Sequence, residues 1–254
     1  MNYWVAYKTL VHKEVARILR IWPQTILPPV ITMSLYFVIF GNLIGKRIGT
    51  MGGFDYMSYL VPGLVMMSVI TNSYGNVVSS FFGAKFGKHI EELMVAPVPP
   101  LIIMLGYLSG ALMRGLSVGT VVLMVSLGFT HVHILHPAIT LSVVILTSVV
   151  FGLAGFINAI FAKNFDDISI IPTFILTPLT YLGGVFYSVS VLPDFWRHVS
   201  SVNPILYMVN AFRFGMLGVS DVPLATAYGI ILIFVLALGA SCLQLLKKGI
   251  GLRS

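Results

Sequence analysis

Charged residues are scarce in this chain, and long stretches lack them entirely. Only 9% of the 254 residues are Asp, Glu, Lys or Arg, while 57% are hydrophobic; an ordinary soluble domain has about 25% charged residues. Residues 115–162 contain none of the four, and this stretch is about twice the ~20 residues that one helix needs to cross a bilayer. The sequence therefore predicts an all-α membrane protein with several spanning helices.

Cysteine is nearly absent. The single Cys242 excludes an internal disulfide and a metal site built from several cysteines, and its apolar neighbours predict a buried, unreactive thiol. His131, His133 and His136 lie close to Pro137 without an Asp, Glu or Cys nearby. Because a zinc site also needs a defined second shell, we expect these histidines to lie at a turn on the membrane surface, and we expect no bound metal.

Catalytic arrangements are missing as well. No Ser-His-Asp, His-Glu-x-x-His or paired-carboxylate set occurs within a shared span. Residues 40–47, FGNLIGKR, are superficially similar to a phosphate-binding loop but lack its first glycine and its Ser or Thr. We therefore expect no catalytic residues and no ATP hydrolysis by this chain.

The spanning helices are predicted from uncharged windows of sufficient length. Six such windows cover residues 21–45, 56–84, 101–130, 137–162, 168–193 and 222–246, and Arg114 is the one charge within them. The turn between the third and fourth falls where histidines and a proline interrupt the apolar run. We expect a single domain over residues 1–254, with an interfacial segment at 1–20, a six-helix membrane part at 22–246 and a cytoplasmic tail at 247–254.

Residues 3–20 are too charged to span the bilayer, yet they have the periodicity of an amphipathic helix. Lys13, Arg17 and Arg20 share one face, and Glu14 falls near the edge of the apolar stripe. The apolar stripe consists of Trp4, Tyr7, Val11, Val15, Ile18 and Trp22. This pattern predicts an interfacial helix that lies on the membrane.

Lys and Arg also indicate the orientation, because they concentrate in cytoplasmic loops. With the N-terminus inside, the cytoplasmic side holds Lys8, Lys13, Arg17, Arg20, Lys85, Lys88, Lys163, Lys247, Lys248 and Arg253. The external side holds only Lys46, Arg47, Arg197 and Arg213. We expect both termini in the cytoplasm, and we interpret the net charge of +7 as a sign of orientation and not of nucleic-acid binding.

Arg114 is predicted to lie near the middle of the bilayer. It is ~13 residues into a helix that begins near Leu101, which places it ~20 Å deep at about 1.5 Å per residue. A charge at that depth costs about 2.5–3.5 kcal/mol, so it needs a polar partner or water. A transport role and structural pairing are both open, and the lack of an intramembrane carboxylate for proton coupling favours structural pairing.

The fifth window contains features that bend helices. Pro172 and Pro178 remove backbone donors, and Gly183 and Gly184 allow close helix approach at its outer end. A hinge and a static kink are both compatible with this pattern.

Two connections are unusual. The first is residues 83–100, GAKFGKHIEELMVAPVPP, which predict a short amphipathic cytoplasmic helix terminated by prolines. A solvated loop next to a basic membrane anchor is equally compatible with this spacing. Residues 188–222 are long and apolar for an external connection. Two helices that dip back into the outer leaflet, Leu192–Ser201 and Pro204–Leu217, would keep their backbones hydrogen-bonded there.

These two regions together resemble the ABC-type-2 permease family. The first is similar to the family pattern R-x-x-G-T-L-E-x-L-x-x-x-P, with matches at Glu91, Leu93 and Pro97 and departures at His89 and Ile90. The second resembles the run P-x-x-x-x-G-G-x-F followed by Leu-Pro, Asn-Pro, Tyr and Arg. Its matching residues are Pro178, Gly183, Gly184, Phe186, Pro193, Asn203, Pro204, Tyr207 and Arg213.

The resemblance implies the membrane half of an ATP-driven exporter in a bacterial inner membrane. Two copies of this chain would join two copies of a separate ABC ATPase, which would hold ATP and Mg, so this chain would need no cofactor of its own. The first region would be a coupling helix that contacts the ATPase through Lys88, Glu91, Glu92, Leu93, Met94 and Pro97, and the interfacial helix would make a second contact.

The resemblance also implies a pathway at the homodimer seam, lined by the first, second and fifth spans. Its pathway or hinge residues would be Arg114, Pro178, Tyr181, Gly183, Gly184 and Phe186, and the external re-entrant motif would be Pro193, Asn203, Pro204, Tyr207 and Arg213. A lipid, a glycan, a drug-like amphiphile or a peptide would all suit such a seam.

A secondary transporter driven by an ion gradient is the alternative from another class. It would need an intramembrane acid or a histidine relay. The carboxylates of this sequence fall outside the predicted spans or at their ends, which favours the exporter.

Overall fold

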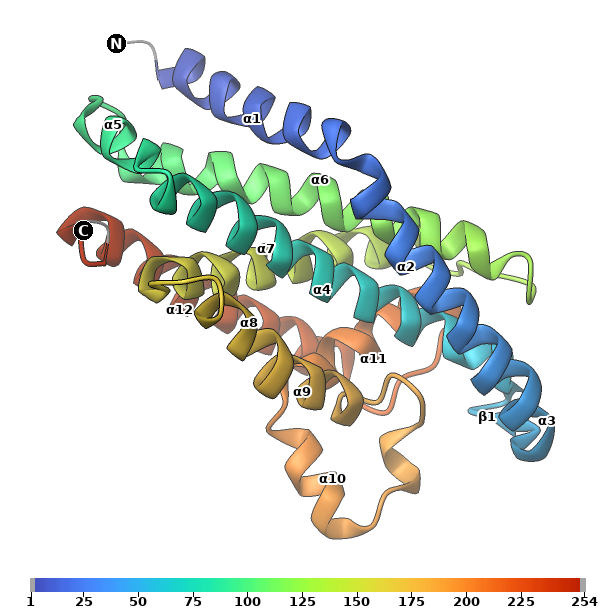
Figure 1. Ribbon diagram of the computed structural model, residues 1–254. Coiled ribbons are helices and arrows are strands. Elements are labelled where there is room, and N and C mark those ends of the chain that lie inside the picture. The colour runs from blue at the N-terminus through green and yellow to red at the C-terminus, as the bar shows by residue number, and fades with distance from the viewer. Residues whose placement is uncertain (1–2, 252–254) are drawn as a thin grey trace.

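The computed structural model describes residues 3–251, which form an elongated bundle of helices (Figure 1). The long helices are α1 (Tyr3–Arg20), α2 (Trp22–Tyr36), α4 (Tyr56–Phe86), α6 (Pro100–Ser126), α7 (Pro137–Phe161) and α12 (Leu224–Lys248). The shorter helices are α3 (Gly45–Ile48), α5 (His89–Val95), α8 (Asp167–Ile171), α9 (Thr177–Leu182), α10 (Asp194–Ser201) and α11 (Pro204–Leu217). The chain is predominantly helical, as predicted. The last part of the predicted tail, including Arg253, lies outside the described residues.

Two π-helical stretches and one 3-10 turn complete the helical elements. The π-helix η1 (Phe37–Ile44) continues α2, η2 (Pro172–Leu176) joins α8 to α9, and the 3-10 turn is η3 (Val189–Val191). Strands β1 (Thr50–Met51) and β2 (Phe54–Asp55) form a small antiparallel hairpin. Its two-residue turn needs positive φ at both positions, and Gly52 and Gly53 supply φ values of 61° and 84°.

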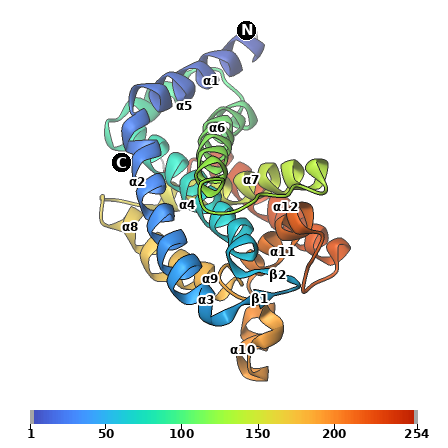
Figure 2. The same ribbon diagram turned by 90° about the vertical axis from the view of Figure 1, so that its right-hand side faces the viewer.

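Helix α4 is the centre of the bundle. It packs against α6, α7 and α11, and in Figure 1 it runs between α2 above and α8–α9 below. Figure 2 shows its far end beside α11 and the hairpin. Its side chains belong to both large clusters of buried hydrophobic residues. Because neighbouring helices surround it, α4 can also bury polar side chains such as Asn72, Asn76 and Ser80.

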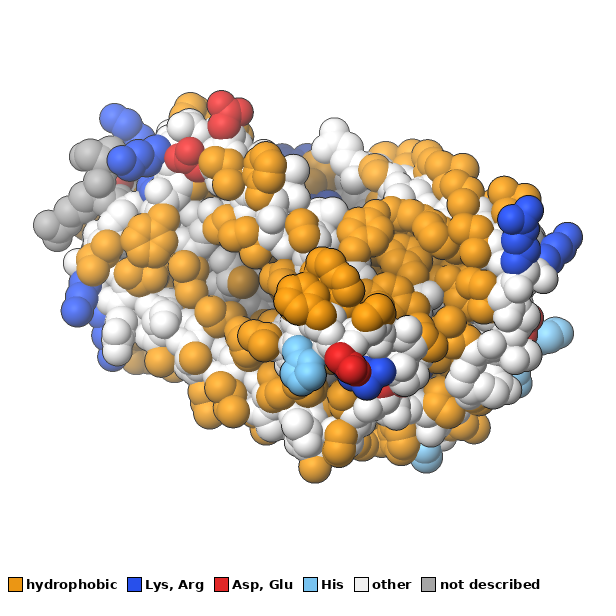
Figure 3. All heavy atoms as spheres, turned by 90° about the horizontal axis from the view of Figure 1, so that it is seen from below, with side chains coloured by type: hydrophobic (Ala, Val, Ile, Leu, Met, Phe, Trp, Pro, Cys, Tyr) orange, Lys and Arg blue, Asp and Glu red, His pale blue; other side chains and the backbone are white. Residues whose placement is uncertain are grey.

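The two ends of the bundle carry different elements. In Figure 1 the N-terminus, α5 and the end of α12 lie at one end, and α3 with the β-hairpin lies at the other. Figure 3, which views the side from which α10 projects, shows a surface that is mainly hydrophobic. Lys and Arg gather near its two ends, apart from one acidic and basic pair near the middle. This distribution suits a molecule whose middle is surrounded by lipid.

Among the described residues, four helical segments are long and apolar enough to cross a membrane. They are Trp22–Ile48, Pro100–Ser126, Pro137–Phe161 and Leu224–Lys248. The second predicted window corresponds to α4, which is 31 residues long but carries the buried polar side chains named above. The fifth corresponds to the helix Asp167–Leu182, which at about 1.5 Å per residue is ~24 Å long, shorter than ~30 Å of hydrocarbon. The six-span arrangement therefore stays a prediction.

The fifth helix ends earlier than its window, which was predicted to run to residue 193. It stops at Leu182 because Gly183 and Gly184 follow, and Gly184 has φ 72°, the left-handed conformation that ends many helices. The external helices form at nearly the predicted residues: α11 has the predicted bounds, and α10 begins at Asp194 because Leu192 and Pro193 are extended. Their re-entrant insertion into a bilayer stays a prediction.

Helix α1 has the predicted bounds, but the face it buries is rotated from the predicted stripe and shares only Ile18 with it among the fully buried residues. The side chains buried against the bundle are Leu10, Glu14 and Ile18, whereas Trp4 from the predicted stripe is 58% exposed. Glu14 thus lies in the middle of the buried face and not at the edge of the apolar stripe. The physical reason is the surface of α6, where Gly106 approaches Leu10 and Gly110 approaches Glu14, because two glycines one turn apart let helices pack closely.

Candidate functional site

A cavity with both polar and apolar lining lies between α2, α4 and α6 and contains Arg114. It has a volume of ≈ 280 Å³, and its polar lining includes Gln24, Thr71 and Asn72. Arg114 Nε donates a hydrogen bond to Asn72 Oδ1 at 3.3 Å, so the predicted structural pairing exists, but with an amide and not with a carboxylate. The cavity places a half-buried guanidinium beside hydroxyl and amide groups within the membrane part of the chain.

One face of α4 continues from this cavity along the helix. We call Thr71, Gly75, Ser79 and Gly83 the α4 stripe; Gly75 is half-buried and the other three are exposed. All four side chains are small, and a Cβ built on Gly75 or Gly83 would meet no atom within 4 Å. Thr71 of the stripe faces α2, since it lines the Arg114 cavity with Gln24, Pro28 and Met33 of that helix. In Figure 1, α8 and α9 run along the other side of α4.

Aromatic side chains join α2 to α9 beyond that surface. The hydroxyls of Tyr36 and Tyr181 are 2.8 Å apart. The ring of Phe186 packs on Tyr181, Tyr36 and Phe40, with centroid separations of 5.4, 5.6 and 4.8 Å. The predicted residues Tyr181 and Phe186 are therefore neighbours, and Tyr36 connects them to the first predicted span.

The prolines of the fifth window distort its helix locally. Pro172 begins the π-helical stretch η2, and Pro178 follows directly after it in the first turn of α9. The Pro172 carbonyl oxygen accepts both from the Thr177 hydroxyl, at 2.9 Å, and from the Thr177 backbone N–H, which closes the wider turn. Whether this site acts as a hinge stays a prediction.

Arg213 fixes the segment that follows α9. Its Nη2 donates to the carbonyl oxygen of Gly184 at 2.7 Å, and its guanidinium lies 4.1 Å from the ring centroid of Tyr59. Burial lowers the pKa of Arg213, while the nearby Tyr59 and Asp221 favour its charged form. Asp221 in turn accepts hydrogen bonds from Ser188 Oγ at 2.6 Å and from the Val189 backbone at 2.9 Å. The Gly-Gly segment is thus held by a buried cation on α11.

The other residues of the external motif have local structural contacts. Asn203 caps α11 by accepting from the Ile205 backbone at 3.0 Å, and its Nδ2 donates to the Leu179 carbonyl oxygen at 2.6 Å. Pro204 is the first residue of α11. Tyr207 Oη donates to the Ser201 carbonyl oxygen at 2.7 Å. Pro193 is the residue immediately before α10.

Helix α5 projects at the end of the bundle that carries both described chain ends (Figure 1). Its Ile90 is buried, while Glu91, Glu92 and Pro97 are exposed and Leu93 is half-buried. The side chain of Met94 lies outside the described part. This pattern confirms an amphipathic helix that prolines follow, and it leaves an acidic surface on one side.

Lys85, in the last turn of α4 just before α5, anchors the end of α4 to the end of α7. Its Nζ donates to the carbonyl oxygens of Ile160 at 2.5 Å and Ala162 at 2.8 Å, which otherwise would lack partners at the end of α7. A cation is favourable at a helix C-terminus. A displacement of α5 would therefore be transmitted to α4 directly and to α7 through Lys85.

Lys88 connects α4 to α5 in a left-handed conformation, with φ 60°. We expect Lys88→Gly to tighten the turn, because a non-glycine residue in this conformation costs about 1–2 kcal/mol. Hydrogen exchange of the α5 amides should slow by about tenfold. Lys163→Gly is the control, since Lys163 is exposed and lacks a positive φ; equal effects of the two variants would contradict the interpretation.

A buried polar cluster at α1 was missed by the sequence reasoning. Glu14 is only 1% exposed; it accepts from Arg17 Nη2 at 3.3 Å and Asn76 Nδ2 at 3.4 Å, and from the Ser80 hydroxyl. Arg17 Nη2 also donates to Asn76 Oδ1 at 2.7 Å. The available signal was the i, i+4 spacing of Asn76 and Ser80 on α4, combined with Gly106 and Gly110 on α6.

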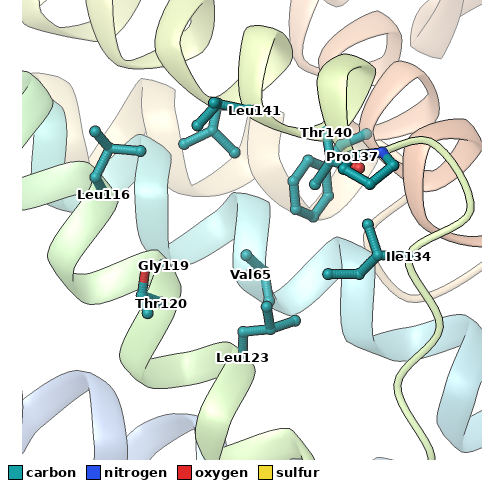
Figure 4. Close-up of a pocket in the computed structure, with 11 residues that line it drawn as sticks. Val65, Leu116, Gly119, Thr120, Leu123, Ile134, Pro137, Thr140 and Leu141 are labelled. Carbon is teal, nitrogen blue, oxygen red and sulfur yellow. The ribbon is translucent and has the colours of Figure 1, made fainter.

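A second recess lies between α4, α6 and α7 and is apolar (Figure 4). It has a volume of ≈ 170 Å³, and Thr120 and Thr140 carry the only side-chain hydroxyls in its lining. No charged side chain lines it. This recess suits hydrocarbon, and the Arg114 cavity suits a polar group.

Residues 3–251 contain neither a cluster of potential metal ligands nor an exposed thiol. In this part of the chain no group of three or more His, Cys, Asp or Glu side chains could hold a metal ion. Cys242 is fully buried, with its thiol directed at the Leu153 carbonyl oxygen at 3.5 Å, as its apolar neighbours predict.

The apolar helices and this arrangement of motifs define an integral membrane transport permease. The family model described as ABC-2 type transporter matches residues 5–217, and the chain belongs to this family. It is 57% identical over 252 residues to the inner membrane transport permease YadH of Escherichia coli strain K12, covering 99% of this chain and 98% of that protein.

More distant relatives are nodulation proteins. The chain is 27% identical over 188 residues to nodulation protein J of Rhizobium meliloti, covering 72% of this chain and 71% of that protein. It is 22% identical over 202 residues to nodulation protein J of Rhizobium leguminosarum bv. viciae. The family and the name of the inner membrane relative, with the apolar helices, indicate an integral inner membrane protein that takes part in transport and is not itself catalytic.

Proposed function

We propose that this chain is the membrane subunit of an ATP-driven exporter, assembled as two copies with two copies of a separate ABC ATPase that holds ATP and Mg. The observation that carries the proposal is α5. It is a short helix with an exposed acidic surface at one end of the bundle. It connects to α4 through one turn, and Lys85 at the end of α4 is bonded to the end of α7. Such a helix can transmit a push from a docked ATPase into the membrane helices.

The proposed orientation places α5 and both termini in the cytoplasm and gives six spans, with α4 and Asp167–Leu182 as the second and fifth. Helix α1 lies at the cytoplasmic interface and makes a second contact with the ATPase. Helices α10 and α11 lie on the external side, with their apolar surfaces in the outer leaflet. The distribution of Lys and Arg supports this orientation.

The proposed pathway runs along the α4 stripe at the seam of a homodimer. Large apolar side chains are exposed on both flanking elements, including Ile31 and Leu35 on α2 and Phe174 and Ile175 in η2. Such a surface suits a second copy or lipid better than water. Tyr36, Tyr181 and Phe186 would close its external end, and bending at Pro172 and Pro178 would open it.

The contacts of Glu14 do not favour secondary transport. A proton-coupled transporter needs a carboxylate that can gain and lose a proton within the pathway. Glu14 is buried, but it is paired with Arg17 and accepts from Asn76 and Ser80. These contacts engage the carboxylate in holding α1 to α4, away from the proposed pathway.

The proposal predicts that the purified chain has no ATPase activity until its partner is added. We expect Glu91→Lys and Pro97→Leu to leave membrane insertion unchanged and to reduce co-purification of the ATPase by about tenfold, since each changes the proposed docking helix. Mass spectrometry of the co-purified material identifies a polypeptide with a complete phosphate-binding loop.

The matched control is Asp166→Lys, which makes the same change of charge at the exposed turn after α7, on a different segment from α5. It should retain the ATPase. ATP turnover by the chain alone would refute the proposal, and full retention of the ATPase by both α5 variants would refute the role of α5.

A further inference from the structure

Arg114 has unused hydrogen-bonding capacity inside the membrane part of the chain. Its one hydrogen bond uses Nε, and neither terminal amino group has a hydrogen-bond or ion-pair partner among residues 3–251. Helix α6 runs from Pro100 to Ser126, so Arg114 is close to its middle. A cation there has neither full solvation nor a compensating charge, which costs about 2.5–3.5 kcal/mol.

No carboxylate of the chain is available to compensate this charge. The eight acidic residues are Glu14, Asp55, Glu91, Glu92, Asp166, Asp167, Asp194 and Asp221. Of these, Glu14 is bound to Arg17 and Ser80, Asp55 caps the start of α4, and the others lie in or beside short helices outside α2, α4 and α6. A second copy carries the same eight residues at the same positions, so dimerisation supplies no acid at this depth either.

The surroundings of Arg114 combine polar and apolar side chains, as an amphiphile requires. The cavity of ≈ 280 Å³ is lined by Arg114 and its polar neighbours Gln24, Thr32, Ser68, Thr71 and Asn72, and by the apolar side chains of Pro28, Pro29, Met33 and Met67. Its volume is close to the lower limit of about 300–1,000 Å³ for small-molecule sites, which is enough for a headgroup. It includes Thr71 of the α4 stripe, so it opens on the proposed pathway.

We propose that Arg114 binds the anionic group, a phosphate or a carboxylate, of an amphiphilic substrate as that substrate crosses the membrane. Guanidinium groups bind these anions with two parallel hydrogen bonds, and the two terminal amino groups of Arg114 are available for that geometry. The headgroup of a resident lipid lies at the interface, ~15 Å from the bilayer centre, so only a molecule in transit brings an anion to this depth. The inference rests on the proposed function and narrows its substrate class to anionic amphiphiles.

A pair of photoreactive amphiphiles tests this assignment. Both carry a dodecyl chain with a diazirine next to the headgroup; one ends in phosphate and the other in trimethylammonium. The full-length chain, with any ATPase that co-purifies, is placed in phosphatidylcholine nanodiscs and illuminated with each probe. We expect the phosphate probe to label peptides from α2, α4 and α6 around the cavity at least about tenfold more than the cationic probe.

The variants separate binding from folding. Arg114→Gln should abolish the preference for the phosphate probe, and Arg114→Lys should keep part of it because the positive charge remains. The control Arg197→Gln changes an exposed arginine on α10 and should leave the preference unchanged. Size-exclusion profiles show whether each variant is folded. Absence of a preference in the original chain, or its persistence in Arg114→Gln, would overturn the inference.

Competition distinguishes the sources of the anion. If an equal concentration of inorganic phosphate displaces the probe, the site binds a free ion. If phosphatidylglycerol in the nanodisc displaces it, the site binds a resident lipid. Either result would overturn a substrate role. The proposed function is tested separately, by measuring whether an ATPase co-purifies in the same preparations. If an ATPase co-purifies but the phosphate probe is not preferred, the anion-binding role of Arg114 is wrong and the proposed function stands. If the phosphate probe is preferred but no ATPase co-purifies, the proposal of an ATP-driven exporter is wrong.

Discussion

Glu14→Ala is expected to destabilise the protein by about 3–5 kcal/mol, because it leaves Arg17 without its carboxylate in a largely buried place. The Glu14 side chain is 2% exposed and that of Arg17 is 18% exposed. The substitution also removes acceptors for Asn76 and Ser80 and leaves a cavity between α1, α4 and α6. Unfolding in mixed SDS micelles measures the loss, and trypsin cleavage in α1 should become faster because this helix is held to the bundle by the cluster.

A double-mutant cycle separates the ion pair from the packing. Combining Glu14→Ala with Arg17→Ala should cost less than the sum of the two single changes, since no charge is then left buried without a partner. His12→Ala is the matched control on the exposed side of α1 and should change stability by no more than about 0.5 kcal/mol. If Glu14→Ala were as mild as His12→Ala, the cluster would not be what fixes α1.

The long apolar helices could be predicted from the sequence because their length is set by the bilayer. The windows 137–162 and 222–246 correspond to α7 and α12 within two residues at each end, and 101–130 corresponds to α6 apart from its last turn. Charge is excluded from such segments over their whole length, so the signal accumulates over many residues. The family was predicted from two motif regions, and the comparisons confirm it.

Pairings between distant residues could not be predicted in the same way. The buried face of α1 depends on Gly106 and Gly110 of α6, roughly ninety residues away in the chain, and no periodicity within α1 reports their position. The partner of Arg213 is a backbone carbonyl, that of Gly184, and any residue type could supply it. The motif identified these residues, but only the fold shows that the buried cation holds the Gly-Gly segment.

Gly63→Ala and Gly75→Ala are expected to change stability in opposite directions, although both place the same methyl group on α4. A Cβ at Gly63 would lie 2.1 Å from the backbone oxygen of Val185 and 2.8 Å from its carbonyl carbon. A backbone held by Arg213 through Gly184 cannot move aside easily, so overpacking should cost about 1–3 kcal/mol. At Gly75 a Cβ meets nothing within 4 Å, and the change should stabilise the helix by about 0.5–1 kcal/mol.

The same unfolding titration in SDS micelles compares the two variants, and the aromatic contact supplies a second measurement. The strain at Gly63 should displace the segment from Gly183 to Phe186 and separate Tyr181 from Tyr36, whose hydroxyls are 2.8 Å apart. Oxidative dityrosine cross-linking between Tyr36 and Tyr181, which needs the two phenol rings in contact, should therefore be slower in the Gly63→Ala background and unchanged in the Gly75→Ala background. Equal stabilities and equal rates would mean that α4 does not rest on this segment, and the proposed closure of the pathway by Tyr36, Tyr181 and Phe186 would lose its support.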